Sequence, residues 1–364
     1  MPNIKFKSRP VQALIDLSKL EQNLSVVRRY APKARIMAVI KANAYGHGLI
    51  RTAKALKNAD GFAILELDSA IRLRNAGFRQ PILLLEGFFS MAELAQFKQY
   101  HLSAVIHHKA QLEMLSAFEY KGLDVFIKLN TGMNRLGFSP KEFPYAFHSL
   151  KKNPAINQIT LMTHFADADD PSGAEKVNEQ IQCFNAITSG LIQPRSLANS
   201  AALIRYPQTH NDWVRPGIML YGASPLAEKT ADQLGLQPVM TVSSKLIAIQ
   251  DLKVGDRVGY GGLFHATHPM RIGIVACGYA DGYPRHAPTG TPILVNGQLT
   301  RTIGTISMDM MTVDLSHINN CEINCPVVLW GKGQPVDEIA HSANTISHEL
   351  LSAIAPRVAK KYSN

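Results

Sequence analysis

The chain alternates short apolar runs with segments of helical period, and this alternation constrains its fold more than any other feature. Apolar runs with the length of a β-strand lie at residues 11–17, 35–40, 61–65, 81–85, 102–106, 123–129 and 156–162. Segments with helical spacing lie between them, for example at residues 19–30 (opened by the cap candidate Ser18), 49–57, 91–99 and 175–188. Repeated βα units favour a parallel sheet, and about eight units, with a last strand near residues 217–221, predict closure into a barrel.

Beyond about Leu236 the helical period fades and short Val, Ile and Gly segments replace it. These segments, at residues 254–262, 271–277, 292–295 and 302–315, are typical of strands and turns. We therefore predict an α/β fold, with a TIM-like (β/α)8 barrel over residues 11–235 followed by a predominantly β domain over residues 236–364. Residues 1–10 would form an N-terminal segment that packs on the β domain.

Composition argues against several classes of function. The formal net charge is +10, but basic residues are interspersed with acidic ones, which favours a solvated surface over a nucleic-acid interface. No apolar run approaches the ~18 residues of a membrane span. The four cysteines give no disulfide framework, and His317, Cys321 and Cys325 lack a fourth ligand at a convincing spacing for zinc. We expect a cytoplasmic protein with no metal, membrane or nucleic-acid partner.

Chemically useful side chains follow the apolar runs. Lys41 comes after residues 35–40, Arg135 after 123–129 and His164 after 156–162. Because the carboxyl ends of barrel strands converge on one rim, we expect these groups to meet. A lysine within apolar walls has a lowered pKa, which suits imine formation. The alternatives are a solvent-exposed lysine, a surface ion pair and a structural histidine.

Ser200, Gly217 and Ile218 suggest an anion site. Ser200 lies where a helix is expected to begin, and Arg215 precedes a Pro-Gly turn. The Ser200 hydroxyl and the amides of Gly217 and Ile218 could bind a phosphate. Asn199 and Ser200 are equally a common helix cap. The residues alone thus predict a phosphate-bearing, imine-forming ligand in a barrel.

Motifs along nearly the whole chain resemble the alanine racemase family. Residues 38–48, around Lys41, are similar to its pyridoxal phosphate attachment motif. The other matching strings, in order, are residues 13–17, 128–137, 162–166, 198–201, 214–222, 258–261, 278–282 and 307–309. In this order and spacing the motifs are highly specific.

The resemblance implies a two-base racemisation of alanine. Lys41 would hold pyridoxal 5'-phosphate as an imine and act as the base on the D side, while Tyr260 acts on L-alanine from the opposite face. Racemisation removes a proton from one face of Cα and returns one to the other, which a single fixed group manages poorly. A free tyrosine has a pKa of about 10, so Tyr260 needs help. That help would come through His164 and Arg215, with Arg215 also facing the pyridine nitrogen.

The resemblance also implies the remaining binding residues. Arg135 and the Met308 amide would flank the substrate carboxylate, and Tyr279 would line the entrance. The phosphate would be held by Tyr45, Ser200, Gly217 and Ile218. Spacing alone does not separate Tyr260, Tyr279 and Tyr283 as bases. The family further implies a homodimer in which Tyr260 and Met308 reach the partner's barrel.

Two positions leave the substrate and the site chemistry open. Many members have a tyrosine before the C-terminal Arg-Val pair, but this chain has Pro356, so serine turnover is also considered. Tyr362 is a weak substitute. Lys128 corresponds to a lysine that is carbamylated in parts of the family, and a plain lysine or an ion pair is equally consistent with the sequence.

Alternatives to a dedicated alanine racemase are a broader alanine/serine racemase, an amino-acid decarboxylase on the same barrel and a noncatalytic pyridoxal phosphate carrier. The D-alanine could serve peptidoglycan synthesis, or the enzyme could serve alanine breakdown.

Overall fold

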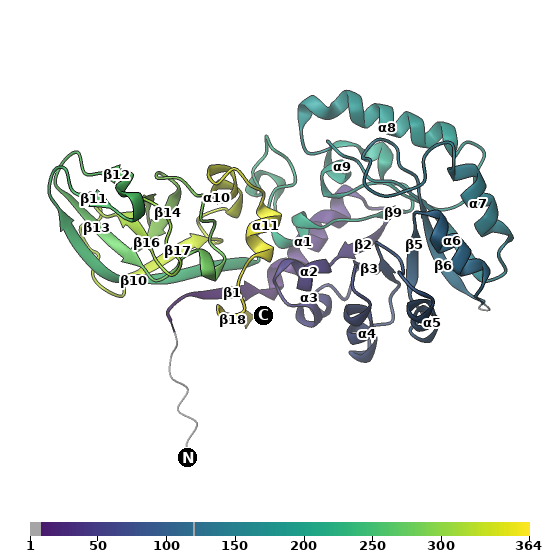
Figure 1. Ribbon diagram of the computed structural model, residues 1–364, viewed down its shortest axis with the longest axis horizontal. Coiled ribbons are helices and arrows are strands. Elements are labelled where there is room, and N and C mark those ends of the chain that lie inside the picture. Colours follow the sequence, from purple (N-terminus) through teal and green to yellow (C-terminus); the bar gives the residue numbers. More distant parts are fainter. Residues whose placement is uncertain (1–8, 119–120) are drawn as a thin grey trace, which may run out of the picture. The chain divides into compact units, whose positions relative to one another are not determined.

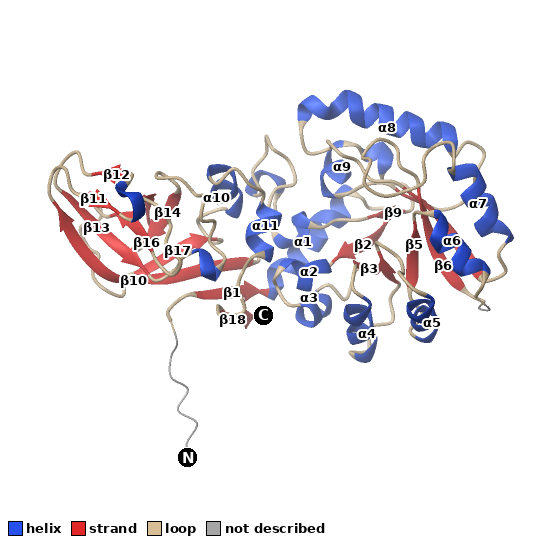
Figure 2. Ribbon diagram, viewed as in Figure 1, coloured by secondary structure: helices blue, strands red, loops and turns tan. Residues whose placement is uncertain are grey.

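The structure is a computed structural model that describes residues 9–118 and 121–364. The chain divides into two compact units, drawn in Figures 1 and 2. One spans Leu20–Leu236, and the other joins Gln237–Asn364 to the N-terminal residues up to Lys19. The expected segment 1–10 falls mainly on residues 1–8, which lie outside the described residues. No helix in the described ranges combines the length and apolarity needed to cross a bilayer.

The first unit is a closed barrel of parallel strands, which confirms the predicted fold class. The strands are β2 (Arg35–Val39), β3 (Gly61–Ile64), β4 (Ile82–Leu84), β5 (Ser103–Ile106), β6 (Leu123–Lys128), β7 (Ile156–Met162), β8 (Arg195–Ser196) and β9 (Trp213–Val214). In β3, β4 and β5 every residue is buried, because the barrel interior covers one face and helices cover the other. This double burial explains why these runs lack a polar alternation.

Helices lie around the outside of the barrel strands (Figure 2). The helices of this region are α1 (Leu17–Tyr30), α2 (Lys41–Tyr45), α3 (Leu49–Ala55), α4 (Leu67–Asn75), α5 (Met91–Gln99), α6 (Lys109–Ser116), α7 (Phe143–Lys152), α8 (Ala174–Ile187) and α9 (Ser200–Arg205). Short 3-10 turns are η1 (Pro171–Gly173), η2 (Pro207–Thr209), η3 (Ile218–Tyr221) and η4 (Asp232–Leu234). Most helices directly follow a strand, so the carboxyl ends of the strands feed the loops that carry the candidate residues.

The second unit is built on an eight-stranded sheet with the order β13-β16-β15-β14-β17-β10-β1-β18. Its strands are β1 (Gln12–Asp16), β10 (Met240–Leu252), β13 (Met270–Val275), β14 (Pro292–Val295), β15 (Gln298–Ile303), β16 (Met311–Asp314), β17 (Pro326–Trp330) and β18 (Ala359–Ser363). A small ladder pairs β11 (Arg257–Val258) with β12 (Phe264–His265). The turns η5 (Tyr260–Gly262) and η6 (Tyr279–Asp281) and the helices α10 (Val336–Ser342) and α11 (Ser347–Ser352) complete the unit.

The prediction that residues 11–17 begin the barrel is wrong. β1 pairs with β10 and β18 in the β unit, not with a barrel strand. Its burial alternates, with Ala13 and Ile15 buried and Leu14 exposed, as expected for a strand with only one covered face. Apolar content alone did not distinguish this strand from the doubly covered barrel strands.

Two local predictions also need correction. The last barrel strand is β9, and the segment near residues 217–221 forms η3, because Pro216 and Gly217 end the extended backbone after β9. The cap of α1 is Asp16 rather than Ser18. The Asp16 carboxylate accepts hydrogen bonds from the Ser18 amide at 3.1 Å and the Ser18 hydroxyl at 2.6 Å.

Candidate active site

Lys41 stands where β2 ends, and the backbone after it turns in the left-handed sense. Residues 42–45 all have φ between 49° and 56°, although none is glycine. Such a conformation costs roughly 1–2 kcal/mol per residue for L-amino acids, and strain of this kind persists only where surrounding contacts determine it. The backbone that follows Lys41 is therefore strained, and contacts with its surroundings must hold it in this conformation.

Several contacts hold the strained turn. The Ala44 amide donates to the Ile40 carbonyl at 3.0 Å, and the Gly48 amide donates to the Asn43 carbonyl at 2.9 Å. The Asn43 side chain accepts from the Leu49 amide at 2.9 Å, which ties the turn to the start of α3. The Tyr45 ring stacks on Tyr221 with centroids 4.5 Å apart. Of the four residues, Asn43 is the one whose type tolerates left-handed backbone.

Lys41 is half-buried, and its surroundings disfavour the charged amine. Burial, followed by the Arg135 guanidinium, lowers the pKa of Lys41, while Glu86 and Glu66 oppose that shift. Glu86 was not among our predicted residues. It follows β4 as Lys41 follows β2, so the same position at a strand end would have identified it.

Arg215 is buried and held by oxygen acceptors at the carboxyl ends of β7 and β8. Nη1 donates to the Ser196 carbonyl at 2.6 Å and the Ser196 hydroxyl at 2.7 Å. Nη2 donates to the Thr163 carbonyl at 2.7 Å and contacts His164 Nδ1 at 3.3 Å. Among the described residues nothing accepts a hydrogen bond from Nε of Arg215. The guanidinium is thus fixed with one donor available.

The contact with Arg215 determines which nitrogen of His164 carries a proton. Arginine only donates, so Nδ1 of His164 must accept. Burial and then the charges of Arg215, Lys128, Arg135 and Lys41 lower the pKa of His164 far below its ordinary value, so the ring is neutral. A neutral ring that accepts at Nδ1 carries its hydrogen at Nε2. His164 therefore presents a donor away from Arg215.

The predicted phosphate residues lie together. The Gly217 amide donates to the Ser200 hydroxyl at 2.8 Å, and a Cβ on Gly217 would lie 2.7 Å from the Tyr45 hydroxyl oxygen. Burial raises the pKa of Tyr45 to about 12, so its hydroxyl remains a donor at neutral pH. Asn199 caps α9 through the Ala202 amide at 2.9 Å. Ser200 is thus not the cap, and its hydroxyl faces Gly217.

Lys128, at the end of β6, is 6% exposed. Burial, with Arg215, Arg135 and Lys41 nearby, lowers its pKa to about 8, against the opposing charge of Glu86. Within the described part of the chain Lys128 forms no ion pair, so the ion-pair interpretation is wrong for this structure. Lys41, Lys128, Arg135 and Arg215 together make this rim strongly cationic.

Arg135 lies on an exposed loop after β6 whose shape is fixed by Asn130. The Asn130 carboxamide oxygen accepts from the amides of Gly132 and Asn134 at 3.1 and 3.0 Å, and its nitrogen donates to the Asn134 side chain at 2.9 Å. The loop closes where Leu129 bridges Phe138. An exposed guanidinium on an ordered loop is suited to binding a carboxylate.

The candidate residues of the β unit lie near its surface. Tyr260 is 72% exposed and begins η5, and Met308 is 53% exposed. Tyr279 is half-buried beside Met308, with its amide donating to the Ser307 carbonyl at 3.1 Å. Tyr283 is fully buried, so the structure separates it from the two tyrosines that a substrate could contact.

Pro356 is exposed on the segment between α11 and β18. Tyr362 is a residue of β18, where it pairs with Ile15 of β1. The pairing of β18 with β1 fixes the backbone position of Tyr362.

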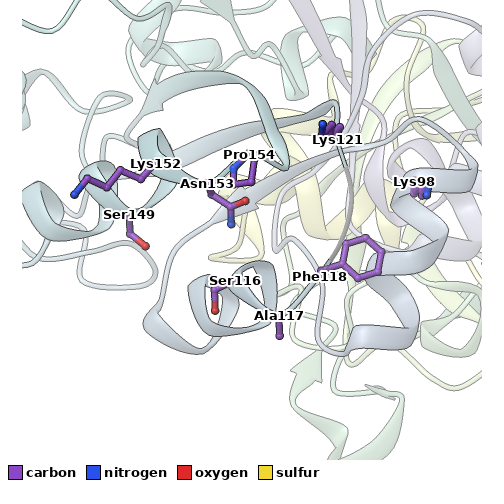
Figure 3. Close-up of a pocket in the computed structure, with 9 residues that line it drawn as sticks. All are labelled: Lys98, Ser116, Ala117, Phe118, Lys121, Ser149, Lys152, Asn153 and Pro154. Atoms are coloured by element: carbon purple, nitrogen blue, oxygen red, sulfur yellow. The ribbon is translucent and has the colours of Figure 1, made fainter.

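The barrel unit also has a hollow of about 900 Å³, and none of the candidate residues lines it (Figure 3). It is lined by Lys98, Ser116, Ala117, Phe118, Lys121, Ser149, Lys152, Asn153 and Pro154. Most of these residues belong to the ends of α6 and α7 and the loops that lead into β6 and β7. In barrels of this type that end of the strands contributes stability, whereas the opposite end carries the chemistry. We therefore assign no catalytic role to this hollow.

Comparison with known families covers both units. Residues 15–225 match the model of the alanine racemase N-terminal domain, and residues 239–362 match that of the alanine racemase C-terminal domain. Together these matches include most of the chain.

Relatives match over nearly their full length. An alanine racemase of Nitrosospira multiformis is 63% identical over 352 residues, covering 96% of this chain and 99% of the relative. A catabolic alanine racemase of Salmonella typhimurium is 51% identical over 353 residues, covering 96% and 98%. The crystal structure of a biosynthetic alanine racemase from Pseudomonas aeruginosa superposes with a TM-score of 0.96 at 43% identity, covering 98% of this chain and 100% of that one. The chain therefore belongs to the alanine racemase family of isomerases.

Proposed function

We propose that this protein interconverts L- and D-alanine with pyridoxal 5'-phosphate and two bases, Lys41 and Tyr260. The observation that carries the proposal is the arrangement at one barrel rim of a lysine with lowered pKa, a fixed arginine–histidine pair and a hydroxyl-lined anion site. Membership of the family supports the reaction class, and these contacts support the roles of individual residues.

The residues at the barrel rim fit the cofactor. The hydroxyls of Tyr45 and Ser200 and the amide of Ile218 supply donors and no carboxylate, which suits a phosphate. The Gly217 amide, which here donates to the Ser200 hydroxyl, would exchange that acceptor for the phosphate. A side chain at position 217 would collide with the Tyr45 hydroxyl, so the close approach requires glycine. Lys41 would bind the aldehyde, and Nε of Arg215 is the donor available to the ring nitrogen. When bound, the cofactor supplies an electron sink that acidifies the substrate Cα–H.

Lys41 would act on the D side. An amine whose protonated form is penalised by burial and by Arg135 is a better nucleophile and proton acceptor near neutral pH than an exposed lysine. The left-handed turn after Lys41 fixes the point on the backbone from which its side chain extends.

Tyr260 of the partner subunit would act on the L side. Its 72% exposure within its own chain supports a role at another surface, because a base must be enclosed with the substrate to act efficiently. The Nε2 hydrogen of neutral His164 would donate to the phenol oxygen and stabilise its deprotonated form. Arg215 would hold His164 in the tautomer that makes this possible.

The substrate carboxylate would lie between Arg135 and the amide of the partner's Met308. A charge-assisted bond from Arg135 and a backbone donor fix the amino acid without selecting one enantiomer, which a racemase requires. The exposure of Met308 and Tyr260 on one chain supports a homodimer whose sites are shared.

A chiral assay tests the proposal. Purified protein, reconstituted with pyridoxal phosphate, should convert L-alanine to a near-equal mixture of enantiomers and should act on L-serine more slowly. Loss of carbon dioxide would favour a decarboxylase, and binding of cofactor without any change of either amino acid would favour a carrier.

A further inference from the structure

Four charged side chains of the β unit form a closed ring of alternating sign, which we call the Arg-Asp ring: Arg9, Asp281, Arg357 and Asp309. Arg9 contacts Asp309 Oδ1 at 2.9 Å and Asp281 Oδ2 at 3.2 Å. Arg357 contacts Asp281 Oδ1 at 2.8 Å and Asp309 Oδ1 at 2.7 Å. Each arginine thus bridges both aspartates, and each aspartate bridges both arginines.

The ring differs from ordinary surface ion pairs because one member is buried. The Asp281 side chain is 1% exposed, and its carboxylate also accepts from the Gly278 amide at 3.0 Å. A buried carboxylate is strongly destabilising unless it is paired. Arg9 and Arg357 provide that pairing from two segments that are distant in sequence. The ring therefore couples the N-terminal segment and the segment before β18 to the Asp281 loop.

Backbone contacts bring the same segments together. The Tyr279 amide donates to the Ser307 carbonyl at 3.1 Å, and the Ala280 amide donates to the Met308 carbonyl at 2.9 Å. A Cβ on Gly278 would lie 2.2 Å from the Ser307 carbonyl oxygen. The loop after β13 therefore packs so closely on the loop before β16 that position 278 admits only glycine.

The other side of the Asp281 loop is equally close to the chain near Pro356. Gly282 has a φ of +105°, and a Cβ there would lie 2.5 Å from the Ala353 carbonyl oxygen. The Ala355 amide donates to the Asp281 carbonyl at 3.2 Å. The loop that carries Tyr279 is thus held between two segments, and the Arg-Asp ring joins all of them.

We propose that the Arg-Asp ring is a positioning device for the substrate-carboxylate site. Asp309 directly follows Met308, and Asp281 lies two residues after Tyr279, so fixing the two aspartates fixes the backbone of both candidate substrate contacts. The ring touches no reacting atom, and it acts through Met308 and Tyr279. This inference rests on the proposed function for the role of Met308, but the rigidity it predicts is a property of the β unit alone.

The Arg357–Asp309 pair of the ring favours the charged form of both partners. Arg357 lowers the pKa of Asp309, and Asp309 in turn raises the pKa of Arg357. A carboxyl with a depressed folded pKa keeps its stabilising contacts above its ordinary value of 3.8 and loses them only as the pH falls through the folded pKa. The contact between Arg357 and Asp309 is therefore retained near neutral pH.

Arg357→Gln tests the inference, with Arg301→Gln as a matched control. Arg301 pairs with Asp314 at 3.0 Å in the same unit, and Asp314, like Asp281, is 1% exposed. In the holoenzyme we expect Arg357→Gln to speed hydrogen exchange of the amides of residues 305–310 and to raise the KM for alanine about tenfold, with kcat changed by less than about threefold. Arg301→Gln should leave both unchanged, and Arg357→Lys should partly restore KM.

Asp309→Asn provides a second variant, because it leaves the buried Asp281 paired and so threatens folding less. It should shift KM and exchange in the same direction as Arg357→Gln. Faster exchange without a rise in KM, or equal effects of Arg357→Gln and Arg301→Gln, would overturn the positioning role. If the unaltered protein does not racemise alanine, the proposed function fails, and the exchange data still decide whether the ring braces the loop.

Discussion

The candidate residues of the barrel unit and those of the β unit have opposite surroundings. Arg215 is buried among oxygen acceptors, and Ser200 and Tyr45 face Gly217 in a tight cluster. Tyr260 and Met308 lie at the surface of the same chain. The barrel residues are held in place by contacts within their own unit, whereas Tyr260 and Met308 are open to solvent. This contrast favours an enzyme whose cofactor site is complete in one chain and whose chemistry needs two.

The largest expected effect follows from dividing the two bases between chains. Lys41→Ala and Tyr260→Phe should each reduce kcat about a thousandfold. Mixing the two variants under subunit exchange should restore about a quarter of the activity, because half of the dimers are mixed and one of their two sites has both bases. Activity is measured by chiral chromatography after exchange.

A double variant, Lys41→Ala with Tyr260→Phe, serves as the control, since mixing it with Lys41→Ala leaves no site with Lys41. Absence of recovery in the first mixture would contradict sharing between chains and would require Tyr260 to act on its own barrel.

Replacing Arg215 tests whether this buried arginine determines which reaction the cofactor carries out. Guanidinium does not readily give up a proton, so an arginine at the pyridine nitrogen should weaken the electron sink and suppress transamination. Arg215→Glu should raise conversion of the cofactor to its amine form, relative to racemisation, at least about tenfold. Absorbance spectra of the cofactor report the conversion, and Arg215→Lys retains the positive charge as a control. An unchanged ratio would show that this interpretation of Arg215 is wrong.

Replacing Lys128 tests how much the buried positive charge at the barrel rim destabilises the folded protein. Its folded pKa of about 8 lies below the ordinary value of 10.5, so the unfolded chain binds more protons between these values and stability rises with pH across that window. Below pH 8 Lys128 is charged in both the folded and the unfolded chain, so the full free-energy cost of its buried charge is present. Lys128→Met should therefore raise the free energy of unfolding by about 2 kcal/mol at pH 7 and by much less at pH 10.

Urea denaturation of the apo-protein at both pH values measures the difference, with the exposed Lys54→Met as the control. Destabilisation at pH 7 would contradict this electrostatic cost.

The smallest effects should come from the other two tyrosines. Tyr279→Phe removes one hydroxyl at the entrance, and we expect at most a threefold change in KM, which is about 0.7 kcal/mol. The Tyr283 hydroxyl is buried and has no hydrogen-bond partner among the described residues, so Tyr283→Phe should leave both activity and stability nearly unchanged. Steady-state kinetics and thermal melting measure these changes. A large loss of kcat in Tyr279→Phe would move the second base from Tyr260 to Tyr279.

The barrel was predictable from sequence because its strands are buried on both faces and its helices keep their period. The runs at residues 156–162 and 91–99 coincide with β7 and α5. The sequence did not predict that β1 belongs to the sheet of the β unit, because this depends on its long-range pairing with β10 and β18. The helices α10 and α11 are too short to produce a clear helical period, and they were missed.

The sequence predicted which residues lie at the strand ends of the candidate site, but it did not predict their local geometry. Lys41, His164 and Arg215 were identified because each lies beside a strand. The left-handed backbone at Ala42 and Ala44 has no local signal, since alanine disfavours it and tertiary contacts impose it. The Arg-Asp ring was also invisible, because it joins Arg9 to residues about 270 to 350 positions later in the chain.

The most direct measurement is borohydride reduction of the protein reconstituted with pyridoxal phosphate, followed by mass spectrometry of its peptides. We predict one phosphopyridoxyl adduct on the Lys41 peptide, loss of that adduct in Lys41→Ala and its retention in Lys128→Met. An adduct at Lys128 instead, or a colourless protein with no adduct at Lys41, would contradict the account of the site.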